Sequence, residues 1–226
     1  MRNWNITYRV VRSAVGLFFK VYGHWEVCGR ENVPRKGGCI VVSNHISYLD
    51  PPLMGCTIPR LGHFMAKSDL WQNKFLAWIM PKLNVYPIQK GKPDLASIRY
   101  TLEKLESGYP VGLFPEGTRS KSGRLLPGEP GVALLIKKSG VPVVPMVIIG
   151  ANKMLPVGAK RIYRARLKTV FGDPIFFTPD CSREEIIREV MRSLARLLTE
   201  NGIPMKAAED LPEEERNALL EAEKKL

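Results

Sequence analysis

Short apolar segments alternate with amphipathic ones along most of this 226-residue chain, and that alternation limits the folds open to it. Runs rich in apolar and β-branched residues predict strands at 23–28, 39–43, 84–88, 111–114, 143–149 and 161–171. Helical signals between them predict helices at 94–108, 131–139 and 182–200. We therefore expect an α/β fold with a largely parallel or mixed central sheet flanked by helices. In such sheets ligands bind beyond the carboxyl ends of the strands.

The helix boundaries are marked by capping residues. Asp94 is a good N-cap and Gly108 a good C-terminal stop, and Ser182 with Glu185 forms a capping box. A further helix is expected from Ser68, as N-cap, to Pro81. Its apolar side is expected to pack in the core, although an interface would give the same pattern; this side comprises Trp71, Phe75, Trp78 and Ile79.

The length and the 45% hydrophobic content suffice for one sizeable core. We expect an amphipathic membrane-interface helix at 1–22, one domain at 23–205 and an acidic helix or tail at 206–226. The four cysteines show no C-x-x-C spacing, which favours a reducing, cytoplasmic environment over a zinc site or a disulfide framework.

The formal charge of +12 is unevenly distributed. Residues 206–226 hold four Lys or Arg against seven Asp or Glu, a net charge of −3, which leaves +15 on the rest. Such a body attracts polyanions, which include nucleic acid, anionic lipid headgroups and phosphorylated metabolites. Charge alone does not choose among them.

The N-terminal segment has the pattern of an interfacial helix. Its longest uncharged apolar run, 13–19, is too short to span a bilayer, and no signal-peptide cleavage site follows it. Basic residues lie opposite an apolar and aromatic stripe. The stripe is Trp4, Tyr8, Val11, Val15, Phe18 and Tyr22, and the basic side is Arg2, Arg9, Arg12 and Lys20. Packing of this stripe on the protein's own core is an equally good interpretation.

The segment 43–50, SNHISYLD, places His45 five residues before Asp50. A histidine held by a carboxylate is suited to remove a proton from a hydroxyl. Asp50 also precedes Pro51 and Pro52, so it is predicted to be the N-cap of a helix. Taken alone, the pair is equally well explained as a helix cap with a histidine nearby.

The segment 114–120, FPEGTRS, gathers residue types that hold a phosphate directly after a predicted strand. Gly117 permits close approach of a ligand, Thr118 offers a hydroxyl, and Arg119 offers a fork of donors. Glu116 is expected to position either the arginine or a substrate hydroxyl. The competing interpretation, which the segment alone favours, is a turn with a surface ion pair between Glu116 and Arg119.

In this order and spacing, the two segments resemble the glycerolipid acyltransferase family, which includes lysophosphatidate acyltransferases. The family's second and fourth blocks resemble VYPIQK at 85–90 and VPVVPMV at 141–147, so the resemblance covers about residues 20–180. Where the family usually has arginine, this chain has Lys90. Lysine binds phosphate as a point charge without the bidentate fork, which bears on phosphate affinity and headgroup choice.

The resemblance implies that His45 is the general base for the sn-2 hydroxyl of a 1-acylglycerol 3-phosphate, which attacks a fatty acyl thioester to give phosphatidate. Asp50 would orient the imidazole and stabilise its cation. Direct transfer is expected, because the sequence contains no G-x-S-x-G nucleophile elbow. The acceptor phosphate would be bound by Lys90, Arg119 and Thr118, and the substrate positioned by Glu116 and Gly117.

The expected acyl donor is acyl-CoA or acyl carrier protein, and neither a cofactor nor a metal is expected. The expected location is the cytoplasmic face of a membrane, peripheral or monotopic, with anionic lipids as partners. Alternative acceptors are glycerol 3-phosphate and other lysophospholipids. Two functions of other classes remain open: a non-catalytic membrane-surface protein, and a basic nucleic-acid-binding protein, although no groove-reading or stacking motif is present.

Overall fold

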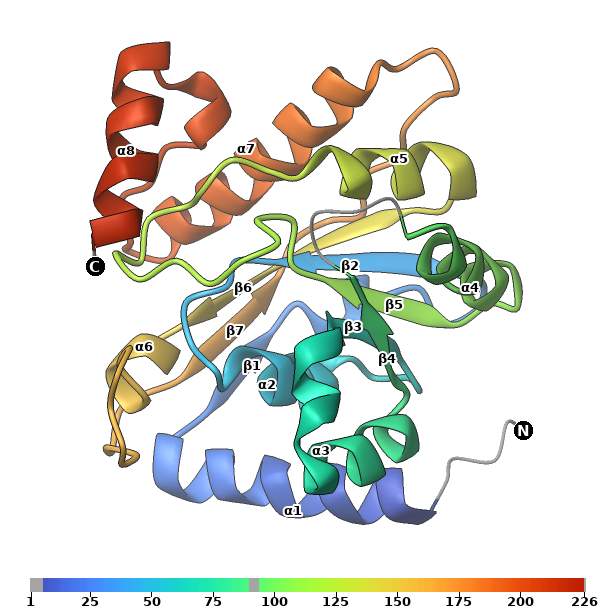
Figure 1. Cartoon of the computed structure of the whole chain (residues 1–226), viewed down its shortest axis with the longest axis vertical. Coiled ribbons are helices and arrows are strands. Elements are labelled where there is room, and N and C mark those ends of the chain that lie inside the picture. Colours follow the sequence, from blue (N-terminus) through green and yellow to red (C-terminus); the bar gives the residue numbers. More distant parts are fainter. Residues whose placement is uncertain (1–5, 90–93, 226) are drawn as a thin grey trace.

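A central sheet organises the molecule, with strand order β1-β7-β6-β2-β5-β3-β4 (Figure 1). The computed structural model describes residues 6–89 and 94–225. The strands are β1 (Glu26–Cys28), β2 (Cys39–Ser43), β3 (His63–Lys67), β4 (Val85–Ile88), β5 (Pro110–Leu113), β6 (Val143–Ile149) and β7 (Lys168–Phe171). All neighbouring strands pair in parallel except β6 and β7, so the predicted α/β fold with a largely parallel sheet is confirmed.

The register of the central strands brings the ends of β2 and β5 to one edge, beside the middle of β6. Val42 of β2 lies opposite Leu113 of β5 and Pro145 of β6. The loops that leave β2 and β5 therefore start side by side, as expected for parallel neighbours.

Three strands differ from the predictions by more than one residue. The strand predicted at 23–28 starts at Glu26, because the preceding helix continues to Gly23. β3 was not predicted, because HFMAK is short, ends in lysine and is buried only at its start. The strand predicted at 161–171 is limited to β7, because the residues before it bond to loop and helix backbone instead of a strand. Tyr163 N donates to Met154 O (2.8 Å) and Leu167 N donates to Gly23 O (2.9 Å).

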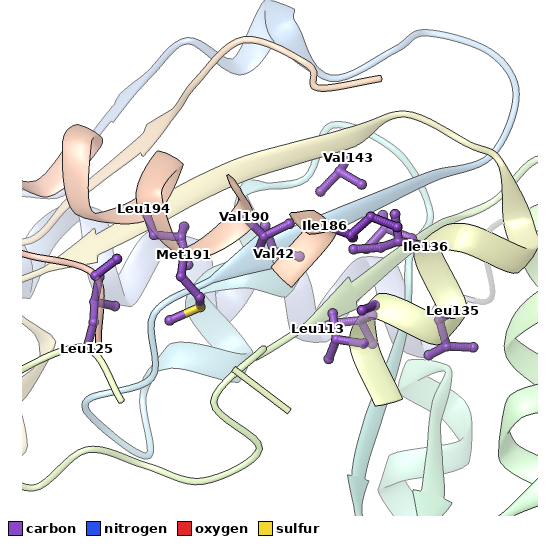
Figure 2. Packing of buried hydrophobic residues seen from close by; sticks show 14 of the residues in the cluster. Val42, Leu113, Leu125, Leu135, Ile136, Val143, Ile186, Val190, Met191 and Leu194 are labelled. Atoms are coloured by element: carbon purple, nitrogen blue, oxygen red, sulfur yellow. The ribbon is translucent and has the colours of Figure 1, made fainter. Parts of the chain in front are cut away.

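One face of the sheet is covered by α4 (Leu95–Glu106), α5 (Pro130–Ser139) and α7 (Arg183–Glu200). Figure 2 shows buried side chains of α5 and α7, among them Ile136 and Val190, meeting Val42 and Leu113 of the sheet. The predicted caps are confirmed: Asp94 accepts from Ser97 N, and Ser182 and Glu185 form the capping box.

The other face is covered by α1 (Ile6–Gly23) and α2 (Asp50–Thr57). β2 is buried on both sides, as its apolar sequence predicts. Its successive side chains point to opposite faces, so Val41 packs with Leu53 and Phe19 while Val42 packs under α7.

The helix expected between Ser68 and Pro81 is broken into three parts. They are η2 (Ser68–Gln72), α3 (Lys74–Ile79) and η3 (Met80–Leu83). The N-cap of α3 is Asn73, which accepts from Phe75 N and Leu76 N, and not Ser68. The core interpretation is wrong for Phe75 and Trp78, which are 66% and 57% exposed.

Helix α1 presents two apolar faces. Tyr8, Val15 and Tyr22 of the predicted stripe turn toward the protein, where Tyr8 is buried and the other two pack beside the core; Trp4 lies outside the described residues. Arg12 also turns inward and donates to Ile58 O (2.7 Å). The exposed apolar side chains of α1 form a different face, which comprises Ile6, Val10, Leu17 and Val21. These four recur at spacings of four, seven and four, which places them on one side of a helix.

Further helices follow β6 and form the C-terminal end. α6 (Ala151–Met154) follows β6, and η4 (Ala208–Asp210) and α8 (Glu213–Lys225) form the C-terminal end. Within residues 6–89 and 94–225, none of the helices has the length and apolar character needed to cross a membrane.

Candidate active site

Two loops meet at the edge where β2 and β5 end. We call residues 44–49, between β2 and α2, the histidine loop, and residues 114–129, between β5 and α5, the arginine loop. Two hydrogen bonds to the His45 backbone join them. Glu116 Oε1 accepts from His45 N (2.9 Å), and Ser120 N donates to His45 O (2.7 Å). The arginine loop thus holds the His45 backbone on both sides.

His45 and Asp50, paired by sequence spacing, lie together in the structure. His45 Nδ1 is 2.9 Å from Asp50 Oδ2, and Asp50 is fully buried. The same oxygen accepts from Ile46 N and Ser47 N, both at 2.6 Å. The predicted N-cap role of Asp50 is wrong: Asp50 is the first helical residue, Leu49 is the N-cap, and the carboxylate points back into the loop.

This contact sets the state of the His45 ring. A carboxylate only accepts hydrogen bonds, so Nδ1 carries the hydrogen and the neutral ring keeps a lone pair on Nε2. No hydrogen bond from the described residues reaches Nε2. Phe114 stacks on the ring with centroids 4.2 Å apart, and the His45 side chain keeps 18% of its surface exposed. The arrangement leaves one nitrogen available as a base.

Further contacts anchor the histidine loop to β6 and α6. Asn44 Nδ2 donates to Ile148 O (3.0 Å), and Asn44 Oδ1 accepts from Ile148 N (2.8 Å). Ser47 Oγ donates to Leu155 O (3.1 Å). These contacts escaped the sequence analysis, although Asn44 stands directly before His45, because their partners lie more than 100 residues away.

Glu116 is a buried support of the loop junction and does not pair with Arg119. Its second oxygen accepts from Leu126 N (2.9 Å), so backbone donors occupy both oxygens. Burial raises the pKa of Glu116 to about 8, although the hydrogen bonds from Leu126 and His45 oppose the shift. The surface ion pair considered from the sequence is therefore absent.

Arg119 lies over the histidine loop without an ion-pair partner among the described residues. Its guanidinium carbon is 3.7 Å from the centre of the Tyr48 ring, a cation–π contact that the sequence did not reveal. Its Nε is buried and lacks a hydrogen bond in the described part of the chain. The charge is therefore free to meet an anion.

Gly117 and Thr118 precede this arginine in the turn. Gly117 has a φ of +60°, a conformation that L residues rarely adopt, and a Cβ there would lie 2.7 Å from Glu129 Cγ. Lys90, the remaining predicted phosphate ligand, lies outside the described residues. Within residues 6–89 and 94–225, no cluster of three His, Cys, Asp or Glu side chains could hold a metal. The arrangement combines a base with an anion-binding group.

Known proteins resemble this chain in sequence and in structure. The sequence pattern of the Acyltransferase family matches residues 24–149, which include both loops. The chain is 33% identical over 158 residues to the chloroplast 1-acyl-sn-glycerol-3-phosphate acyltransferase BAT2 of Brassica napus, a match that covers 67% of this chain and 45% of that protein. It thus spans less than half of this plant relative.

A bacterial relative is matched over more of its length. The 1-acyl-sn-glycerol-3-phosphate acyltransferase of Bacillus subtilis is 27% identical over 169 residues, covering 74% of this chain and 82% of that protein. The crystal structure of the 1-acyl-sn-glycerophosphate acyltransferase PlsC from Thermotoga maritima superposes with a TM-score of 0.74 at 28% identity, covering 89% of this chain and 83% of the other. This chain belongs to the Acyltransferase family.

Proposed function

We propose that this chain transfers a fatty acyl group from an acyl thioester to the sn-2 hydroxyl of 1-acylglycerol 3-phosphate, forming phosphatidate. One observation carries the proposal: the His45–Asp50 pair lies in contact with the loop that presents an unpaired Arg119. This acceptor needs a base for its hydroxyl and a cation for its phosphate in one place. The relatives from Brassica napus and Bacillus subtilis carry the name of this activity.

In the proposed mechanism, His45 Nε2 accepts the proton of the acceptor hydroxyl while the hydroxyl oxygen attacks the thioester carbonyl carbon. A C–O bond forms, and the carbonyl oxygen becomes the anion of a tetrahedral intermediate. Asp50 keeps its hydrogen bond to Nδ1 and stabilises the imidazolium. Collapse of the intermediate breaks the C–S bond, and Nε2 returns the proton to the leaving thiolate. The products are an ester and a free thiol.

Arg119 is proposed to bind the acceptor phosphate. Stacking on Tyr48 fixes the plane of the guanidinium, so its donors are arranged before the phosphate arrives. Thr118 adds a hydroxyl whose hydrogen-bonding capacity no described group uses. Lys90 is proposed as a further phosphate ligand on the strength of the family resemblance alone.

Glu116 and Gly117 are proposed to position the substrate indirectly. Glu116 holds the backbone N–H of His45, and Gly117 allows the turn that brings Arg119 toward Tyr48. The ring that takes the proton and the cation that binds the phosphate thereby keep a fixed separation.

A thiol-release assay tests the proposed reaction. Purified protein is supplied with oleoyl-CoA or an oleoyl acyl carrier protein, and with 1-acylglycerol 3-phosphate, glycerol 3-phosphate or 1-acylglycerophosphocholine as acceptor. We expect 1-acylglycerol 3-phosphate to give the highest rate. A higher rate with either other acceptor would reassign the substrate, and no thiol release from any combination would refute the enzymatic function.

We further propose that the protein works at the cytoplasmic face of a membrane, attached through the exposed face of α1 and the aromatic pair of α3, without nucleic acid as a partner. The apolar face Ile6, Val10, Leu17 and Val21 is exposed, with values from 61% to 78%. Exposed basic residues Arg9 and Lys20 belong to the same helix. α1 packs against η3, which directly follows α3, so α1 and α3 lie close together (Figure 1).

Substitution is a better test of this attachment than deletion, because the opposite face of α1 buries Tyr8 and Phe19. We expect Val10→Glu combined with Leu17→Glu to weaken binding to phosphatidylcholine vesicles containing phosphatidylglycerol by tenfold or more, since each insertion of such a side chain is worth about 1.5–3 kcal/mol. Asn217→Glu combined with Ala218→Glu, at two exposed positions of α8, is the charge-matched control. Equal vesicle binding by both proteins would contradict attachment through α1.

A further inference from the structure

The acidic C-terminal segment, residues 205–225, is bound to the arginine loop. It comprises η4 and α8, and the end of α8 lies beside this loop in Figure 1. In the sequence this segment resembled a solvated helix or a disordered end. Its acidic side chains are not all solvated, because two of them accept hydrogen bonds from the backbone of the arginine loop.

Glu223 makes the closer attachment. Its Oε2 accepts from Lys121 N (2.8 Å), and its Oε1 accepts from Ser122 N (2.9 Å) and Ser120 Oγ (3.3 Å). Only 9% of Glu223 is exposed. Burial raises the pKa of its carboxyl, but the hydrogen bonds from Ser122, Lys121 and Ser120 outweigh burial and hold it below the ordinary value. The charged form thus holds the three residues that directly follow Arg119.

A second hydrogen bond and an apolar cluster also join the C-terminal segment to the arginine loop. Glu209 Oε1 accepts from Gly128 N (2.7 Å) near the end of the same loop. Leu126 packs with three residues of the C-terminal segment, namely Ala208, Leu211 and Leu219. Leu126 N in turn donates to Glu116, the residue that holds the His45 backbone. A continuous set of contacts thus leads from the C-terminal segment to both functional loops.

We propose that Glu223 is a positioning residue for the acceptor phosphate, holding the backbone of 120–122 so that Arg119 stays over Tyr48 of the histidine loop. The inference rests on the proposed function for the identity of the acceptor. Glu223 contacts no reacting atom and acts through Arg119. The residues matched by the family pattern end at 149, so this role falls outside that match.

The test compares two neighbouring glutamates of α8. Glu223→Gln removes the charge while keeping the size of the side chain, and Glu221→Gln makes the same change at an exposed residue whose partner is Lys224. We expect Glu223→Gln to raise the acceptor KM by about tenfold, the scale of a lost charge-assisted contact, with kcat and the thioester KM within about threefold of wild type. Glu221→Gln is expected to match wild type.

A double variant tests whether the effect passes through Arg119. In an Arg119→Ala background, Glu223→Gln is expected to leave the acceptor KM unchanged, because the group it positions is missing. An additive increase would overturn the inference. An unchanged or lowered acceptor KM in the single Glu223→Gln variant would also overturn it, since a lowered KM would mean that the carboxylate blocks the site.

Amide hydrogen exchange separates this inference from the proposed function. In Glu223→Gln we expect faster exchange at Lys121 and Ser122, with the exchange of β2 close to wild type. Unchanged exchange at these two amides would overturn the positioning role, whether or not the protein is active. Absence of thiol release by wild type, together with faster exchange in the variant, would refute the proposed function and leave the contact with the arginine loop established.

Discussion

The histidine loop and the arginine loop meet at one edge of the sheet but are fixed by different means. In the histidine loop, Asp50 accepts from the His45 ring and from two backbone N–H groups within five residues of itself. In the arginine loop, the acceptors are Glu116, within the loop, and Glu209 and Glu223, about 80 to 100 residues further along the chain. The imidazole ring proposed for proton transfer is therefore held by a carboxylate close to it in the sequence, whereas the turn that carries Arg119 is held by carboxylates of the C-terminal segment.

This difference predicts how the two loops respond to substitution. Changes around His45 should act mainly on the rate of the chemical step, because its local hydrogen bonds determine which nitrogen accepts the proton. Changes in the supports of the arginine loop should act mainly on acceptor binding, because they move Arg119 relative to the ring.

The largest effect is expected from His45→Ala. Loss of a general base lowers kcat by about 10²–10⁴-fold, and the unfolding temperature should also fall, because the ring is only 18% exposed and stacks on Phe114. Thiol release measures the first quantity and circular dichroism the second. His24→Asn is the control, because His24 is exposed and its φ of 44° is one that Asn tolerates. Full activity of His45→Ala would show that the loop does not supply the base.

Asp50→Asn should lower activity and stability together. The amide can place its oxygen or its NH₂ group toward the three donors, but it lacks the charge that stabilises the imidazolium. We expect kcat to fall by about 10²-fold and the free energy of unfolding by about 1.5–3 kcal/mol. Urea denaturation and thiol release measure the two, with exposed Asp69→Asn as the control. A loss of stability with unchanged kcat would make Asp50 purely structural.

Glu116→Gln should change how stability depends on pH. Because the folded-state pKa of Glu116, about 8, lies above its ordinary value of 4.5, the native protein keeps a proton that the unfolded chain has released. Stability should therefore fall as the pH rises from about 5 to 8, and Glu116→Gln should reduce this decline. Part of the decline should remain in Glu116→Gln, because burial also raises the pKa of Glu209. An equal decline in both proteins, measured by denaturation at several pH values, would contradict the assignment.

Tyr48→Leu should have the smallest effect. An exposed cation–π contact is worth about 0.5–1 kcal/mol, so the acceptor KM should rise by about two- to fivefold with kcat unchanged. Tyr163→Leu is a matched control, because it removes a similar contact with Arg161, 4.8 Å from the ring centre, outside the site. Equal effects of the two substitutions on the acceptor KM would show that Tyr48 does not help Arg119 to bind the acceptor.

Much of the sheet could be predicted from the sequence, because strands buried on both faces are continuous apolar runs. β2 and β6 were predicted with the boundaries that the structure has. The contact between His45 and Asp50 was also predictable, since only four residues separate the two side chains. Both successes depend on local sequence.

The failures have a common physical cause. Helix α1 has apolar residues on opposite faces, and periodicity alone does not reveal which face the protein itself covers. The exposure of Phe75 and Trp78 was not predicted for the same reason: an apolar helix face can lie in the core or at the surface. The contacts of Glu223 with the arginine loop depend on the fold, which brings together residues about 100 positions apart.

The central claim is that His45 transfers the proton and that Arg119 binds the acceptor phosphate. Acceptor binding without turnover tests it most directly. A short-chain 1-acylglycerol 3-phosphate, kept below its micelle concentration, is titrated calorimetrically into His45→Ala and Arg119→Ala. We predict that His45→Ala binds with a Kd within about threefold of wild type, and that Arg119→Ala binds about 10- to 150-fold more weakly, the range for a lost hydrogen bond to a charged group. Equal losses of affinity in the two variants, or wild-type affinity in Arg119→Ala, would contradict this division between the loops.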